Sequence, residues 1–301
     1  MKKGLKISAY ILAVLLLALL GAFIAVQSPA VQTYLAKKAI EKTQDRIDGE
    51  LQVGKITVQP LKAVYLEDIL ILDKQPFLEE GHAKLDTILQ AGSIAARFSL
   101  RGLMEGSGIR VSSAHLKDVR FNLALEPGEE HNTTNIQRVL RMKRTEDKEE
   151  SDWGKILYAD KIDIEGFRFR LLNFSAIRRK EAEGSPPVPE HIIDWSDFSL
   201  RSDIHARKLS IADNYISGTV QKMSLSEEGG LDVEELSGRV KVGKGLASIR
   251  NLHIKDKMSD LYLKYLRMIA PLDDYEFFED KVRIEAEILP PTVLALKSIS
   301  R

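Results

Sequence analysis

The chain has 301 residues, with 44 Lys and Arg balanced by 44 Asp and Glu, and it contains no cysteine. Its net charge of zero removes the broad electrostatic attraction to phosphate backbones on which nucleic-acid-binding proteins depend. We therefore expect no nucleic-acid partner. The missing cysteines exclude a disulfide scaffold, a thiolate zinc site, an iron–sulfur cluster and a cysteine nucleophile.

The first element is an uncharged apolar segment that runs from Ile7 to Val26. About 20 residues at roughly 1.5 Å each cover a hydrocarbon core about 30 Å thick, which predicts a transmembrane helix at 7–26. A cleaved signal peptide is the alternative, but its apolar region is usually only about 7 to 15 residues long. The exit of the segment also lacks a small-x-small cleavage site, and Pro29 follows directly after Ser28. A retained anchor is therefore favoured.

The charges around this segment predict its orientation. Positive charge is held on the cytoplasmic side during insertion, and the segment is preceded by Lys2, Lys3 and Lys6. We expect residues 1–6 in the cytoplasm and nearly all of the remaining chain outside it.

A second, amphipathic helix is predicted at 28–47. Ser28 is a favourable N-cap, Pro29 suits the first helical turn, and apolar residues then recur at helical spacing. This helix has two interpretations, because it could pack against the end of the next domain or lie on the bilayer surface.

From Leu51 to the end of the chain the apolar residues alternate with a period of two, which indicates β-strands. In the clearest stretch the apolar residues are odd-numbered and their neighbours polar, and they include Val119, Phe121, Leu123 and Leu125. A second stretch alternates in the same way, with a slip of one residue at Gly166 that indicates a β-bulge, and it includes Ile162, Ile164, Phe167 and Phe169.

Similar strand patterns return every 13 to 16 residues or so in the second half of the chain. They predict a mainly β, repetitive domain at 51–301, built as an array of antiparallel strands. An ordinary two-layer β-sandwich is the alternative. Two charged segments, at 143–152 and 178–190, predict exposed loops.

The sequence offers little catalytic chemistry. The six histidines lack the spacing that brings metal ligands together, and the chain has no phosphate-binding glycine loop and no nucleophile elbow. We therefore expect no metal, no cofactor and no catalytic residues, and we do not expect an enzyme.

Several phrases of the sequence resemble the TamB and AsmA-like envelope proteins of the Bacteroides group, which are related in architecture to chorein-type bridge-like lipid transfer proteins. The phrases are Gln27–Gln32, Gly54–Val58, Leu66–Asp73, Asn132–Ile136, Ser224–Leu231 and Leu236–Gly238. The resemblance implies a single-pass inner-membrane anchor, a periplasmic helix at one end, and a long twisted antiparallel sheet that forms an open hydrophobic groove. It implies no cofactor and no catalytic residues.

The function that this resemblance implies is phospholipid transport toward the outer membrane. The partners would be the inner membrane, phospholipid acyl chains and an outer-membrane assembly barrel of the TamA type. A scaffold or chaperone for the assembly of outer-membrane proteins is the second hypothesis, and an enzyme or sugar-binding sandwich is the third. Family members are usually longer, so the sequence leaves open whether this chain is a fragment or a short relative.

Within this hypothesis the two clearest alternating stretches should line the groove and contact acyl chains. The expected lining residues are Val119, Phe121, Leu123, Leu125, Ile162, Ile164, Phe167 and Phe169.

Overall fold

The structure is a computed structural model. It describes residues 47–59, 62–74, 86–98, 109–126, 133–139, 155–189, 192–213, 215–227, 229–243, 245–269 and 282–295, together with Tyr34, Lys38 and Gln44. The predicted cytoplasmic segment 1–6, the predicted transmembrane helix at 7–26 and the predicted loop at 143–152 lie outside the described residues. Among the residues that are described, no helix combines the length and the apolar character needed to cross a bilayer.

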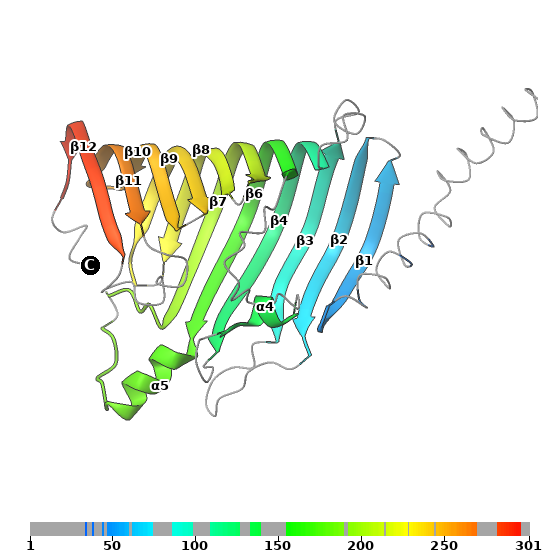
Figure 1. Ribbon diagram of the computed structural model, residues 1–301, viewed down its shortest axis with the longest axis horizontal. Helices are drawn as coiled ribbons and strands as arrows, with labels where there is room; N and C mark the ends of the chain where they lie inside the picture. Colours follow the sequence, from blue (N-terminus) through cyan, green and yellow to red (C-terminus); the bar gives the residue numbers. More distant parts are fainter. Residues whose placement is uncertain are drawn as a thin grey trace, which may run out of the picture.

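The described residues form one large β-sheet with two short helices (Figure 1). The strands are β1 (Gly49–Gln59), β2 (Ala63–Asp73), β3 (Thr87–Phe98), β4 (Ile109–Glu126), β5 (Thr133–Thr134), β6 (Lys155–Asn173), β7 (Asp197–Ala212), β8 (Tyr215–Glu227), β9 (Asp232–Gly243), β10 (Leu246–Lys255), β11 (Asp260–Ile269) and β12 (Arg283–Val293). The helices are α4 (Asn135–Val139) and α5 (Phe174–Ala182).

The strands lie side by side in chain order, except that the two-residue β5 pairs only with the end of β4. Neighbouring strands are antiparallel, as predicted, at every position but one. The exception is β4 and β6, which run parallel. Parallel neighbours need a crossover connection, and here the connection contains β5 and α4. The expectation of a wholly antiparallel sheet is therefore corrected at this pair.

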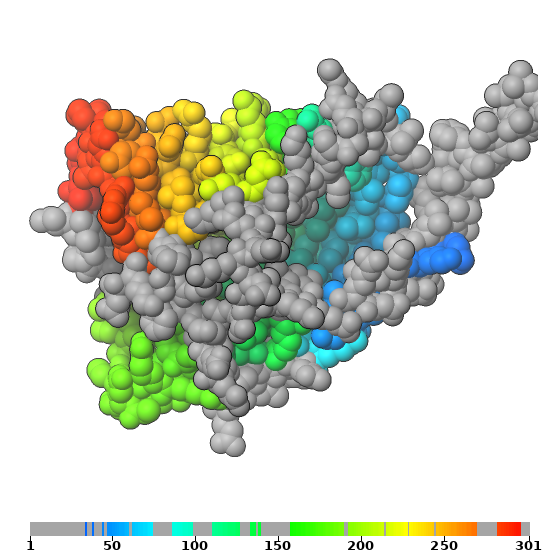
Figure 2. All heavy atoms as spheres, in the orientation of Figure 1, coloured from blue at the N-terminus to red at the C-terminus, as the bar shows by residue number. Residues whose placement is uncertain are grey.

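The sheet is a single open layer. Each strand packs mainly against its sheet neighbours, and β1 and β12 stand at opposite ends of the strand order. Figure 2 shows the same order across the surface, from blue at β1 to red at β12. Within the described residues no second sheet packs face to face with the first, so the alternative of a two-layer sandwich does not apply to this part of the chain.

One face of the sheet is apolar and the other is polar. The side that carries the hydrophobic cluster centred on Ile69, Ala91 and Val119 is called the apolar face. The opposite side, the polar face, carries cross-strand ion pairs, as between Lys55 and Glu67 at 3.1 Å. This division follows from strand geometry, because successive side chains point to opposite faces.

The alternation slips by one residue in each of the first five long strands, and all the slips lie in one transverse row. We call this row the bulge row. The pairing of the strands places its residues side by side: Gly54, Asp68, Gly92, Asp118 and Gly166. Three of them have positive φ, at 54° for Asp68, 52° for Asp118 and 68° for Gly166. The predicted bulge at Gly166 is therefore confirmed, and it is one member of a larger feature.

Because the slips coincide, the apolar face continues across the bulge row. Leu116 and Val119, on either side of Asp118, belong to the same apolar cluster although one number is even and the other odd. A second register shift, between Arg97 and Phe98 of β3, places Phe98 opposite Val111. Two slips in β4 thus cancel, and odd-numbered Val111 and Val119 share the apolar face as the sequence predicted.

Glycine is required in the bulge row by close approach of the next strand. A Cβ at Gly54 would lie 2.9 Å from the Cβ of Asp68, and one at Gly92 would lie 3.3 Å from the Cβ of Asp118. From β1 to β6, the bulge row therefore alternates between glycine and an aspartate with positive φ.

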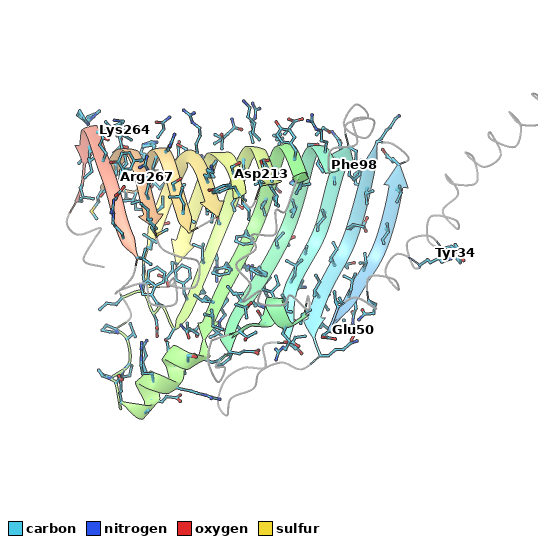
Figure 3. All side chains as sticks on the ribbon, viewed as in Figure 1. Tyr34, Glu50, Phe98, Asp213, Lys264 and Arg267 are labelled. Carbon is cyan, nitrogen blue, oxygen red and sulfur yellow. The ribbon has the colours of Figure 1, made fainter. Side chains whose placement is uncertain are left out.

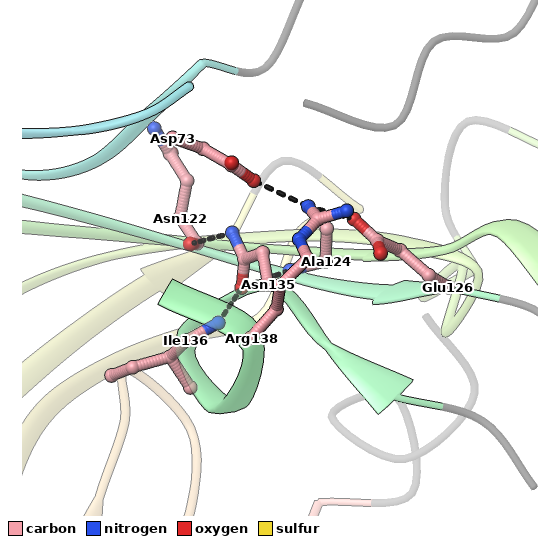
Figure 4. A network of polar contacts seen from close by, with 7 residues as sticks. All are labelled: Asp73, Asn122, Ala124, Glu126, Asn135, Ile136 and Arg138. Carbon is pink, nitrogen blue, oxygen red and sulfur yellow. Dashed lines mark hydrogen bonds and ion pairs between the residues drawn. The ribbon is translucent and has the colours of Figure 1, made fainter. Parts of the chain in front are cut away.

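The two helices pack near one end of the strands. In α4, Asn135 is 1% exposed and its Oδ1 accepts a hydrogen bond from the Ala124 amide at 3.1 Å (Figure 4). Arg138 forms ion pairs with Asp73 of β2 and, at 2.7 Å, with Glu126 of β4. These contacts hold the crossover against the ends of β2 and β4.

Helix α5 buries Phe174 and Ile177 against Ala124 and Leu172. Asn173 caps its first turn by accepting a hydrogen bond from the Ala176 amide at 3.1 Å. The predicted exposed loop at 178–190 thus begins inside this helix, because α5 extends to Ala182. The sequence signal failed here because charged residues occupy the solvent side of a helix as readily as a loop.

Most of the predicted amphipathic helix at 28–47 lies outside the described residues, but Tyr34, Lys38 and Gln44 are helical. Tyr34 is 62% exposed and points away from β1 (Figure 3). Gln44 donates a hydrogen bond to the Gly49 carbonyl and accepts one from the Leu51 amide at 2.8 Å. Its side chain therefore joins this segment to the edge strand β1.

Candidate functional site

The structure places all eight predicted lining residues on the apolar face. On β4, Val119 is buried in the cluster described above. Phe121 lies beside Phe169 of β6, and Leu123 lies beside Leu171. Leu125 lies next along the same face, at the end of β4. This part of the face is therefore built from two parallel strands in matching register.

The residues of β6 continue the same surface toward β7. Ile164 and Phe167 pack on the cluster around Val119, on either side of the bulge at Gly166. Ile162 lies on the same face because it is two residues before Ile164, and it is paired with Ala114 of β4. Contact of these eight side chains with acyl chains stays a prediction.

An aromatic series crosses β4, β6 and the start of β7. The rings of Phe121 and Phe169 stack with their centroids 5.9 Å apart. Phe169 lies 6.3 Å from Phe198, whose ring stacks on Trp195 at 5.2 Å. Sequence reasoning missed Phe198 and Trp195, although the alternation of Phe198, Leu200 and Ile204 could have revealed this strand.

Within the described residues the apolar face does not close into a conventional core. Most of its side chains are half-buried, and toward the C-terminal end they become more exposed. Ile216 and Val242, which oppose each other on β8 and β9, are 40% and 41% exposed, and Ile284 of β12 is 55% exposed. A contiguous series of exposed apolar side chains indicates a surface that binds something apolar.

The polar face behind the predicted site carries a series of ion pairs. Glu165 lies 3.3 Å from Lys117 Nζ and 2.9 Å from His115 Nε2, and the hydrogen bond from Lys117 is the main reason why the pKa of Glu165 lies below its ordinary value. Burial would raise the pKa of Asp163, but hydrogen bonds from Lys161 and His205 lower it overall. In these pairs the opposite charges balance each other on a hydrated face of the sheet.

One polar cluster has the residue types of a catalytic site. Lys180 Nζ lies 2.7 Å from Asp194 and 2.9 Å from Ser196 Oγ, beside a hollow next to α5. Ser196 also donates to Asp194, and burial raises the pKa of that carboxyl less than these donors lower it. A serine that donates to a carboxylate and accepts from a paired lysine has no base to activate it, so this geometry fits a structural cap.

Metal chemistry finds no support in the residues that the structure describes, since they contain no group of three or more His, Asp or Glu placed to hold an ion. The comparisons with known proteins add no family. No protein-family model matches the chain, and no curated protein matches it. The physical character of the apolar face is therefore the main evidence about function.

Proposed function

We propose that the chain carries lipid along the apolar face of its sheet, as an inner-membrane-anchored envelope protein that moves phospholipid toward the outer membrane. The observation that supports this most is the apolar cluster that crosses β1 to β6, together with the exposed apolar side chains on β8, β9 and β12. The anchor, the periplasmic location and the direction of transport rest on the sequence pattern and on the family resemblance. In this proposal the face acts as an open hydrophobic groove.

The energetic argument concerns the lipid tail. An acyl chain of about 16 carbons exposed to water costs on the order of 13 kcal/mol, at about 0.8 kcal/mol for each CH2 group. Apolar side chains along the whole path remove most of this cost at every step. The open side leaves the headgroup in water, so the path needs no specific polar site.

The bulge row supports the same proposal. If each strand slipped independently, polar side chains would turn onto the apolar face at different heights and interrupt the path for a tail. The shared row at Gly54, Asp68, Gly92, Asp118 and Gly166 lets the strands bend while the face remains apolar.

Photo-crosslinking in cells tests this function. A photoreactive residue at Phe121 or Phe169 should give lipid adducts, because both rings lie on the apolar face. The matched controls are Arg120 and Arg168, the preceding residues on the same strands, which are exposed on the polar face and directly paired with each other. Adducts with proteins alone at the two phenylalanines would contradict lipid transport and favour a scaffold for the assembly of outer-membrane proteins.

A further inference from the structure

The polar face of β7–β11 carries a concentration of positive charge that the neutral chain as a whole does not suggest. In one row across these strands, Arg207, Thr219, Arg239, Arg250 and Tyr265 are successive cross-strand partners. In the next row the partners are Ser210, Ser217, Lys241, Ser248 and Arg267. The five cations in these two rows are called the basic patch: Arg207, Arg239, Lys241, Arg250 and Arg267.

The charge of the basic patch is poorly balanced. Neither row contains a carboxylate on β7–β11, and acids enter the rows only on β12, at Glu285 and Glu287. Arg267 reaches Glu285 at 3.9 Å, and Lys241 lies 3.8 Å from the ring centre of Tyr215. The other three cations have no ion pair within the described part of the chain.

The arrangement of the arginines is unfavourable for the sheet alone. Arg239 and Arg250 are both exposed and stand directly opposite each other on neighbouring strands. Like charges at directly opposed positions destabilise a sheet. Some other cations on the polar face are paired, as Lys117 is with Glu165 and Lys161 with Asp163, whereas Arg120, Arg168 and Arg201 form another row of directly opposed arginines. An anionic partner would relieve the repulsion that the sheet itself leaves.

The side chains of the two rows have the chemistry that recognises phosphate headgroups. Arginine binds phosphate with a planar fork, and the hydroxyls of Ser210, Ser217 and Thr219 can donate to phosphate oxygens. Ser248 is buried and donates to the Lys241 carbonyl. Tyrosine, present at Tyr215 and Tyr265, is enriched where proteins meet the headgroup region of a bilayer. From Arg207 on β7 to Arg250 on β10 the patch crosses three strand spacings of about 4.8 Å, or about 14 Å.

We propose that the basic patch docks the C-terminal strands on the surface of an anionic phospholipid membrane. The patch lies on β7–β11, in the part of the strand order that follows its middle, whereas the predicted anchor precedes β1 at one end. Figure 3 shows this separation, with Arg267 and Lys264 far from Glu50. The chain would thus contact a second membrane at its far end. This contact goes beyond the proposed function, because it does not require lipid to pass along the apolar face.

A vesicle-capture experiment tests the docking. The full chain is reconstituted in vesicles of phosphatidylcholine, and labelled second vesicles contain either phosphatidylcholine alone or added phosphatidylglycerol. Capture should require phosphatidylglycerol and should be reversed by high salt, which screens exposed charges. Each cation near an anionic surface contributes about fivefold in affinity. The variant with Arg207→Gln, Arg239→Gln and Arg250→Gln should therefore capture about 100-fold less well.

The matched control removes three other arginines from the same face. Arg120, Arg168 and Arg201 are exposed, and they are successive partners on β4, β6 and β7. The triple variant with glutamine at these positions should retain capture. Equal losses in the two triple variants would overturn the proposal, because net charge alone would then explain binding. Capture of vesicles without phosphatidylglycerol would overturn it as well.

A direct readout uses the absence of native cysteine. An environment-sensitive dye on Thr219→Cys, at the centre of the basic patch, should respond to vesicles that contain phosphatidylglycerol. The same dye on Gln90→Cys, exposed on the polar face of β3, should not respond. A response at Thr219 to soluble tripolyphosphate but not to vesicles would show that the partner is a soluble anion, and the docking proposal would be wrong. Lipid crosslinks at Phe169 should be unchanged by the triple variant, which separates this proposal from lipid transport.

Discussion

The substitution Phe169→Asp separates an open lipid path from a closed core. The Phe169 ring is half-buried and has two aromatic neighbours, Phe121 at 5.9 Å and Phe198 at 6.3 Å. On an open face the new carboxylate stays hydrated. The loss is then half of a buried side chain and two ring contacts, about 2 to 3 kcal/mol in total.

In a closed core the same substitution would be far more costly. An unpaired buried carboxylate adds several kcal/mol, which together with the lost packing approaches the whole stability of an ordinary domain. We therefore expect Phe169→Asp to remain folded, with a lower urea midpoint. Unfolding of the variant in the absence of denaturant would contradict an open face.

The effect on lipid passage should be larger than the effect on stability. The hydrated carboxylate brings water to a stretch of the lipid path one strand wide, about 4.8 Å. About four CH2 groups of a tail are then exposed to water, which costs about 3 kcal/mol. A barrier raised by that amount slows transfer about 100-fold. The assay follows a fluorescent phospholipid between donor and acceptor vesicles joined by the full chain.

The control is Arg168→Asp, which introduces the same side chain one residue earlier and on the polar face. It should transfer lipid at the wild-type rate. If folded Phe169→Asp transfers as fast as this control, acyl chains do not pass over Phe169 and the reasoning fails.

Three further predictions concern stability in urea. Gly54→Ala should lose about 2 kcal/mol because its Cβ would lie 2.9 Å from that of Asp68, and adding Asp68→Gly should restore part of the loss. Asn135→Ala should lose about 3 kcal/mol, since it leaves buried backbone groups without partners. The lowered pKa of Asp163 means that its contribution, under about 1 kcal/mol, is present above its ordinary pKa of about 3.9 and is lost as pH falls below it. Asp163→Asn should abolish that acid-dependent part, whereas an unchanged pH profile would contradict it.

The sequence predicts strands best where several large apolar residues alternate with polar ones. The patterns at 51–58, 61–72, 216–225, 236–242 and 249–254 predicted β1, β2, β8, β9 and β10 close to their observed positions. The strand predicted at 83–89 reaches only the start of β3. The rest was missed because Ala91, Gly92, Ser93, Ala95 and Ala96 provide little hydrophobic contrast and cross the bulge row.

Other differences have physical reasons of their own. The parallel pairing of β4 and β6 cannot be read from alternation, because parallel and antiparallel strands present the same period of two. β11 was not predicted at all, although Leu261, Leu263 and Leu266 lie on its apolar side. The bulge at Gly166 was predictable because glycine marks it, whereas Asp68 and Asp118 give no such signal.

The sequence predicts that the eight candidate side chains share one face, but it does not predict how far the apolar surface extends, and their contact with acyl chains stays a prediction. The eight expected side chains share one face because β4 and β6 each have a clear pattern of their own. The basic patch could not be foreseen, since Arg207, Arg239 and Arg250 are far apart in sequence and only the register of β7–β10 brings them into one row.

The bulge row also makes the length of the sheet adjustable in units of a hairpin. Removing β2 and β3 together would remove one aspartate and one glycine from the row, leaving Gly54 of β1 to face Asp118 of β4. Strand direction would still alternate, because β1 opposes β4 in direction just as it opposes β2. Duplicating the same hairpin would lengthen the sheet under the same rule. A repeating joint of this kind would let the sheet span a different distance by gaining or losing strand pairs, without redesign of the surface between its ends.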